Sequence, residues 1–174
     1  MTTWTVAAVL AAALMWITRL GTRWPSVYYM TGSSMEPTVR ATEYFLAWSA
    51  TARLSRGDLV IFRYRDEDGV FHVLRRLAAF AGDTVSMRAG RAVVNGVPQQ
   101  WAFRIIEPEA WRSVIARGEN LYDWGPWIVP VDSVMLLADT RDIIGWPDSR
   151  FIGYVSHNDI LARVTRTLAG RRLR

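Results

Sequence analysis

The chain has 174 residues, enough for one domain with a hydrophobic core, and 51% of them are hydrophobic. Its 21 basic residues outnumber the 16 acidic ones, and all are arginine, so no amine side chain can serve as a base. With no cysteine and two histidines, the sequence excludes disulfides and thiolate metal sites, and we expect no metal or other cofactor. The arginines are dispersed, which argues against nucleic-acid binding and favours a membrane surface.

The first segment predicts a membrane anchor. Residues 5–17 are uncharged and almost wholly apolar, a pattern that alone is also typical of a buried helix or a signal-peptide core. Trp4 and Trp24 flank the segment 20 residues apart, about 30 Å along a helix, which matches the hydrocarbon thickness of a bilayer. We therefore predict that residues 1–24 form a retained, single transmembrane helix that contacts the lipid bilayer.

After residue 25 the pattern changes to short β-prone segments separated by turns. Strands are expected at 44–48, 58–64, 70–77, 84–87, 91–97, 133–137 and 151–155. Asn95-Gly96 favours a hairpin turn, and one short helix is expected around residues 108–117. The sequence thus predicts a mostly β domain over residues 25–160 and a basic C-terminal tail over residues 161–174.

A Gly/Ser-rich turn follows the predicted anchor and carries a candidate nucleophile. The turn reads Thr-Gly-Ser-Ser-Met-Glu-Pro-Thr over residues 31–38, and Ser34 lies directly before the methionine. A serine just beyond a membrane span is well placed to attack a substrate held near the bilayer. Taken alone, the same residues also fit an ordinary polar turn.

Charged residues lie between apolar strands in the last third of the domain. These residues are Asp139, Arg141, Asp148 and Arg150. Charges embedded in apolar surroundings usually form a buried ion-pair network, so we interpret them as scaffold that holds loops in register rather than as catalytic groups.

Four sequence blocks, in order behind the predicted span, resemble the type I signal peptidases. The blocks are residues 31–38, 55–62, 73–96 and 129–155. Members of this family are membrane-anchored serine proteases that remove signal peptides from secreted proteins. The resemblance covers residues 30–155 and implies a signal-peptidase-type β domain, with Ser34 at the nucleophile position and Gly32 at an oxyanion-hole position.

The same resemblance implies a lysine base where this chain has Arg75. Burial can lower the pKa of a lysine by several units and allow it to take the serine proton. A guanidinium stays protonated near neutral pH, so Arg75 cannot take this role. His72 lies three residues earlier on the predicted strand and should point to the opposite face, unless a one-residue bulge intervenes; His157 follows the last block.

Further departures from the family pattern lie in the last block. Residues 138–141 read Ala-Asp-Thr-Arg where the family usually has Gly-Asp-Asn-Arg. The serine that orients the lysine in the family is not evident, and residues 143–147 replace it. The spacing in this block is also about two residues longer than is usual in the family. Loss of the base, of the orienting serine and of the usual loop spacing together is what we expect once selection for proteolysis lapses.

Three hypotheses follow for the function. In the first, the chain is a catalytically silent relative that binds other subunits of a membrane complex through tryptophans of the soluble part. These are Trp101, Trp111, Trp124, Trp127 and Trp146, of which core packing alone would bury at least half. In the second, it is an active signal peptidase in which His72 or His157 serves Ser34, and only then are signal peptides its substrates. The third is an unrelated anchored β domain.

The resemblance and the charge pattern disagree on membrane orientation. Arg19 and Arg23 follow the predicted span, and the positive-inside rule alone would leave the domain in the cytoplasm. The resemblance implies the opposite side. We follow the resemblance and predict a single-pass protein of the cell membrane with its soluble domain in the periplasm or outside the cell.

Overall fold

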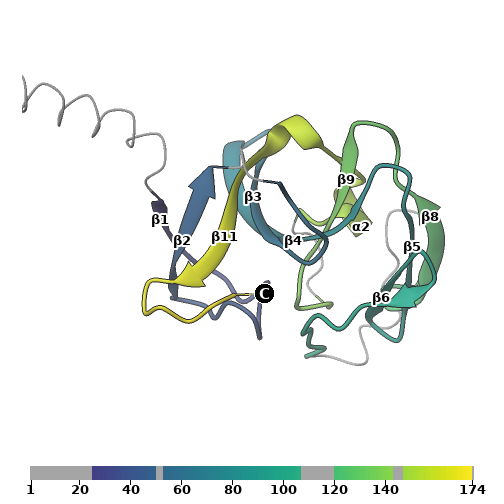
Figure 1. Ribbon diagram of the computed structural model, residues 1–174, viewed down its shortest axis with the longest axis horizontal. Coiled ribbons are helices and arrows are strands. Elements are labelled where there is room, and N and C mark those ends of the chain that lie inside the picture. The colour runs from purple at the N-terminus through teal and green to yellow at the C-terminus, as the bar shows by residue number, and fades with distance from the viewer. Residues whose placement is uncertain (1–24, 50–52, 107–119, 143–146, 174) are drawn as a thin grey trace, which may run out of the picture.

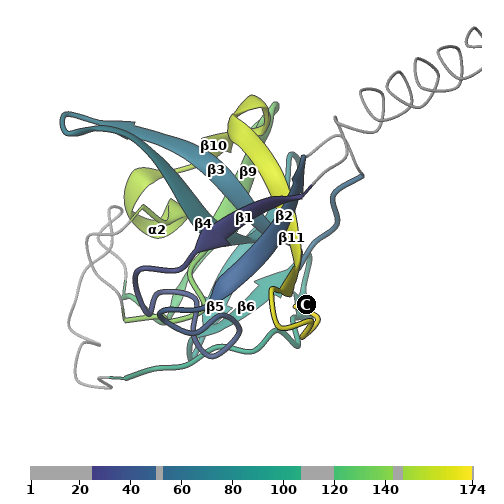
Figure 2. The same cartoon turned by 90° about the vertical axis from the view of Figure 1, so that its left-hand side faces the viewer.

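The computed structural model describes residues 25–49, 53–106, 120–142 and 147–173, which form a mostly β domain. Figures 1 and 2 show two antiparallel sheets side by side, connected by the turn from β4 to β5. This confirms the mostly β prediction. The predicted anchor, residues 1–24, and the predicted helix around 108–117 lie outside the described residues. Within the described ranges, no helix is long and apolar enough to cross a membrane.

The larger sheet has seven strands, all antiparallel to their neighbours. In spatial order they are β1 (Ser26–Tyr29), β2 (Tyr44–Ser49), β11 (Ile160–Thr167), β3 (Leu59–Asp66), β4 (Gly69–Phe80), β9 (Ser133–Leu137) and β10 (Val155–Ser156). Strand β1 stands at one end of this order and pairs with β2 alone. Its other edge therefore keeps backbone hydrogen-bonding groups that no strand of the sheet uses.

The smaller sheet has four strands and shares a hydrophobic core with residues of β4 and β9. Its spatial order is β7 (Val97–Pro98), β6 (Arg91–Val94), β5 (Thr84–Arg88) and β8 (Trp124–Ile128). The predicted hairpin joins β6 to β7, and Asn95 and Gly96 have φ values of 50° and 79°, the left-handed conformation that such a turn requires. Trp124 and Trp127 stack in the core of this sheet with ring centroids 4.3 Å apart.

Strand β4 changes character along its twelve residues and places the central charges of the fold. Its first half pairs with β3 in a hairpin that projects from the domain (Figure 2), and residues 70–72 are exposed. Its second half enters the centre of the sheet, where residues 74–79 are buried. Arg75 and Arg76 lie at the start of this buried half.

The structure differs from the sequence prediction at the C-terminal end of the domain. Residues 151–155 are predicted as a strand, but helix α2 covers Ser149–Ile152 and a short strand begins only at Val155. The Asp148 carboxylate caps this helix by accepting a hydrogen bond from the Arg150 N–H. The predicted tail also contributes structure: β11 extends to Thr167 and lies between β2 and β3, so the sheet continues past residue 160.

Candidate functional site: a serine bonded by a buried arginine

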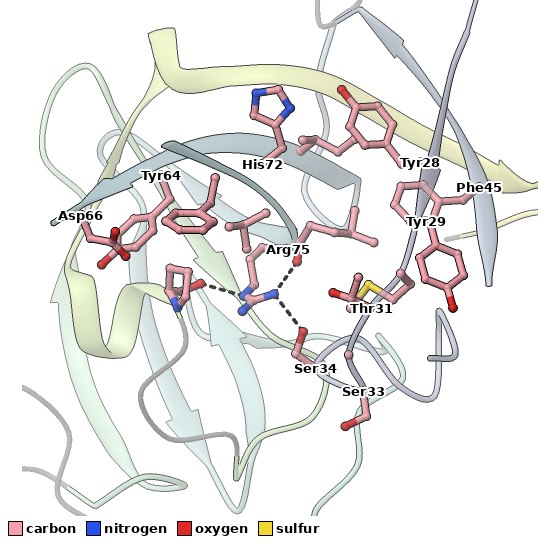
Figure 3. Close-up of a pocket in the computed structure, with 17 residues that line it drawn as sticks. Tyr28, Tyr29, Thr31, Ser33, Ser34, Phe45, Tyr64, Asp66, His72 and Arg75 are labelled. Atoms are coloured by element: carbon pink, nitrogen blue, oxygen red, sulfur yellow. Dashed lines mark hydrogen bonds between the residues drawn. The ribbon is translucent and has the colours of Figure 1, made fainter. Parts of the chain in front are cut away.

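A cavity of about 550 Å³ opens between two pairs of strands, β1 with β2 and β3 with β4. Its walls come from β1 and β2 on one side, β3 and β4 on the other, and Pro147, with the turn at residues 31–34 at one end (Figure 3). Strand β11 separates β2 from β3 in the sheet order, so the sheet must curl for all four strands to face one cavity.

The turn that follows β1 holds Ser34 rigidly at the wall of this cavity. Met35 and Val39, both fully buried, anchor the turn in the core. Thr140 fixes it from the other side: its N–H donates to the Ser34 carbonyl at 3.0 Å, and its hydroxyl donates to the Ser33 carbonyl at 2.7 Å. Ser34 itself is 6% exposed. A serine held in this way has a fixed position relative to strand β4.

Arg75 lies on β4 opposite this turn and contacts the serine hydroxyl. Its Nη1 donates to Ser34 Oγ at 3.1 Å and to the carbonyl of Leu74 at 2.6 Å, and its Nε donates to the carbonyl of Pro147 at 2.8 Å (Figure 3). Its Nη2 is buried and has no hydrogen-bond partner among the described residues. Arg75 has no ion-pair partner in these ranges either, although the side chain is 1% exposed.

Burial lowers the pKa of Arg75, but the side chain keeps its positive charge at neutral pH. The pKa of its guanidinium falls to about 10, mainly because burial penalises the charge; the Asp148 carboxylate opposes this shift and the Arg150 charge adds to it. This pKa is still well above neutral, so Arg75 keeps its positive charge at pH 7.

The direction of the hydrogen bond decides what the Ser34 hydroxyl can do. A general base must accept the serine proton, whereas Arg75 donates a proton into a lone pair of Oγ. The hydroxyl hydrogen of Ser34 and its backbone N–H have no acceptor among the described residues. Ser34 therefore offers the cavity hydrogen-bond donors and is not activated as a nucleophile.

Neither histidine replaces the missing base in the described structure. The register of β3 and β4 is continuous from Leu59↔Arg76 to Asp66↔Gly69, so no bulge turns His72 toward the serine. Figure 3 shows the His72 imidazole beside Tyr28 and pointing away from Ser34; the two ring centroids are 6.3 Å apart. His157 lies in the short 3₁₀ helix His157–Asp159, is exposed, and does not line the cavity.

Gly32 lies in the same turn and lines the cavity. A Cβ atom built at this position would meet nothing within 4 Å, so the glycine is not required by crowding. The structure thus brings Gly32, Ser34 and Arg75 together at one end of one cavity.

Behind the cavity lies a cluster of buried charges that contains the four predicted scaffold residues. Asp139 pairs with Arg76 at 2.6 Å and also accepts the Thr38 hydroxyl at 2.5 Å. Asp148 pairs with Arg150 at 3.0 Å and accepts the Ala138 N–H at 2.6 Å. These bonds tie β4, the 31–38 turn and the end of β9 together.

Arg141 has a different role from the other members of this cluster. It has no carboxylate partner among the described residues: its Nε donates to the Gly90 carbonyl at 2.8 Å, and its Nη1 donates to the Ala138 carbonyl. Burial lowers its pKa to about 10 as well. Four arginines and two aspartates of the cluster are at most 1% exposed, an excess of two buried positive charges. The sequence alone does not reveal this imbalance, because in the sequence Asp83 is an equally available partner for these arginines. In the structure Asp83 pairs with Arg56 instead, at 2.5 Å.

Comparison with known proteins gives a consistent result. The family model for signal peptidase, peptidase S26, matches residues 1–168. Signal peptidase I of Leptolyngbya laminosa is 26% identical over 144 residues, which cover 78% of this chain and 64% of that protein. Probable signal peptidase I-2 of Synechocystis sp. is 30% identical over 142 residues, covering 78% and 59%. Signal peptidase I of Bacillus licheniformis is 30% identical over 145 residues, covering 79% and 73%.

The chain spans about three fifths of the length of the first two of these relatives. A crystal structure of a signal peptidase I from Enterococcus faecalis V583 aligns with a TM-score of 0.44 and 21% identity, covering 66% of this chain and 98% of that one.

Proposed function

The chain belongs to the peptidase S26 family of signal peptidases, and we propose that it is a member that binds peptides or partner subunits without cleaving them. The hydrogen bond from Arg75 Nη1 to Ser34 Oγ carries this proposal. The positive charge of Arg75 would stabilise a serine alkoxide, but no group in the described part of the chain accepts the proton whose loss would form one. General-base catalysis contributes about 10²–10⁴ to rate, and an unassisted hydroxyl forgoes it.

A second candidate, an active peptidase, is favoured by one specific observation. Ser34 lines a cavity of about 550 Å³, and neither its N–H nor its O–H has an acceptor in the described ranges, as an oxyanion-binding position would require. Such an enzyme would depend on the neutral form of Arg75, because neither histidine bonds Ser34 in the described structure. Its activity would therefore be confined to strongly alkaline conditions.

The proposal includes attachment to a membrane through residues 1–24, with the soluble domain on the extracytoplasmic side and other membrane proteins as partners. Trp124 and Trp127 are core residues and do not form the docking face that the tryptophan content suggests. Exposed apolar side chains lie instead on the first two strands, which follow the proposed anchor: Val27, Tyr29, Tyr44 and Trp48 are 55%, 46%, 51% and 40% exposed. This face is suited to contact with the bilayer or with another subunit.

The test is cleavage of a signal-peptide substrate by the full chain in detergent, with Ser34→Ala as the control. We expect no difference between the two proteins at neutral pH, because the hydroxyl has no base. Turnover by the wild type that disappears in Ser34→Ala would contradict the proposal. A matched variant, Ser33→Ala, removes the neighbouring hydroxyl of the same turn and controls for disturbance of the loop.

A further inference from the structure

Unused hydrogen-bond donors gather at one end of the cavity. Among the described residues, the Ser34 hydroxyl hydrogen, the Ser34 N–H and the buried Nη2 of Arg75 have no acceptor. Arg75 and Ser34 both line the cavity and are bonded to each other, so these donors belong to one locus. A buried donor left without an acceptor costs about 1–3 kcal/mol, and more when it is charged, which makes a bound acceptor favourable here.

The charge around this locus indicates an anionic acceptor. The buried cluster has two more arginines than aspartates, and both aspartates are already paired, with Arg76 and Arg150. Arg75 is the unpaired arginine that borders the cavity, since Arg141 does not line it. An anion at Arg75 would compensate one of the two excess charges.

The remaining walls indicate what the anion is attached to. The cavity wall also includes Asp66 and His72, but much of it is apolar and suits small or medium apolar side chains; the apolar part comes from Tyr28, Phe45, Ile61, Phe71 and Leu74. Strand β1 leads directly into the turn with Ser34, and its outer edge pairs with no described strand. An extended peptide can add to such an edge by backbone hydrogen bonds, with alternate side chains directed into the cavity.

From these three observations we infer that the cavity binds the free carboxylate end of an extended, apolar peptide. One carboxylate oxygen accepts the Ser34 O–H and N–H, and Arg75 supplies the compensating positive charge. This inference rests on the proposed function, in which the chain binds peptides at this cavity without cleaving them. Hydrolysis of a peptide bond creates such a carboxylate, so the chain distinguishes a released peptide from the intact precursor, whose carbonyl at that position is uncharged.

The test compares two labelled apolar peptides of identical sequence, one with a free C-terminal carboxylate and one with a C-terminal amide. Binding to the full chain in detergent is measured by fluorescence anisotropy. We expect the free acid to bind about 10- to 100-fold more tightly, the range that charge-assisted hydrogen bonds provide. Arg75→Met should remove the preference and Ser34→Ala should reduce it, whereas Ser33→Ala should leave it unchanged.

The possible outcomes separate this inference from the proposed function. Equal affinity for acid and amide, no binding of the acid, or a preference that survives Arg75→Met overturns the carboxylate site but not the absence of cleavage. Palmitate that displaces the acid peptide at equal concentration overturns the peptide assignment, because a fatty acid has no backbone to pair with β1. Cleavage of a longer peptide overturns the proposed function itself. A thermal unfolding curve for Arg75→Met, run alongside, identifies loss of binding that results from unfolding.

Discussion

Arg75 and Arg76 are consecutive residues of β4, and both are at most 1% exposed, yet their surroundings differ. Arg76 forms a bidentate pair with Asp139, with distances of 2.8 and 2.6 Å. Arg75 bonds carbonyl oxygens and the Ser34 hydroxyl only. Arg76 therefore stabilises the fold through an ion pair, whereas Arg75 is a buried positive charge without a carboxylate bonded to it in the described structure.

This contrast predicts opposite results for two identical substitutions. Arg76→Met leaves Asp139 as a buried, unpaired carboxylate and should cost about 3–5 kcal/mol. Arg75→Met removes an unpaired buried charge and should change the free energy of unfolding by less than about 2 kcal/mol, because relief from desolvation offsets the lost hydrogen bonds. Thermal unfolding followed by tryptophan fluorescence compares the two variants. A loss for Arg75→Met as large as that for Arg76→Met would show that Arg75 is essential to the fold.

At this scale the sequence points to Ser34 and Arg75, and the structure brings these two side chains into contact. The Ser-Met-Glu-Pro block locates Ser34, and the arginine pair at 75 and 76 locates the missing lysine. The sequence could not predict which of the two side chains donates the hydrogen bond, or that the buried cluster has more arginines than aspartates. Both depend on which aspartate each arginine meets, and those pairs join residues as far apart as Arg76 and Asp139.

At the scale of elements, the strand prediction succeeds where apolar residues are bounded by turns, as in β3 and β5, and fails where a side chain caps the backbone. Residues 151–155 have the composition of a strand, but Asp148 caps α2 just before them. Strand β11 falls almost wholly within the predicted tail, although its residues largely alternate between buried and partly exposed positions, the period-two pattern of a strand. The alternation of polar and apolar residues is visible in the sequence, but the arginines at 171, 172 and 174 favour the interpretation as a basic tail.

The last residues are consequently part of the domain, which a pair of leucine substitutions can test. Leu173 is 5% exposed and packs in the core cluster with Met35 and Val39, whereas Leu168 is 56% exposed. Leu173→Ala should lower the free energy of unfolding by about 2–3 kcal/mol, and Leu168→Ala by less than about 0.5 kcal/mol. Chemical denaturation measures both. Equal, small effects would indicate that the C-terminal residues do not pack on the domain in solution.

Gly125 in β8 provides a second test at this scale, because the backbone of the neighbouring strand β5 approaches it closely. Gly125 has a φ of 83°, and a Cβ there would lie 2.7 Å from the Val85 carbonyl oxygen. Gly125→Ala should therefore destabilise the protein by at least about 2 kcal/mol, from the left-handed conformation and from displacement of β5. Gly32→Ala is the matched control, because a Cβ added at that position meets no atom within 4 Å. This variant should unfold at the wild-type temperature. If both variants unfold together, β5 and β8 do not pack as described.

For the whole molecule, paired carboxylates determine the response to acid. Burial acts to raise the pKa of Asp148, but the ion pair with Arg150 and backbone donors outweigh it, so the pKa lies below its usual value of 3.8. The same balance lowers the pKa of Asp83 beside Arg56. A carboxyl whose folded pKa is below its unfolded pKa stabilises the fold above the unfolded value, and this contribution is lost as the pH falls through the folded pKa.

The melting temperature should therefore be constant from pH 7 to about 5 and fall steeply below pH 4. Asp148→Asn should already melt at a lower temperature at pH 7 and should show a shallower decline in acid, because one of the groups that cause the decline is gone. Circular dichroism melts at a series of pH values check this. A decline in the variant as steep as in the wild type would mean that Asp148 is not among those groups.

The family assignment, the cavity and the buried charges together describe a signal-peptidase domain whose serine faces a cation. The most direct test is the pH profile of signal-peptide cleavage by the wild-type chain, with Ser34→Ala subtracted at each pH. We predict no serine-dependent turnover between pH 6 and about 8, where Arg75, with a pKa of about 10, keeps its proton. Serine-dependent turnover near pH 7 would contradict the proposal and would require a base that the described structure does not place beside Ser34.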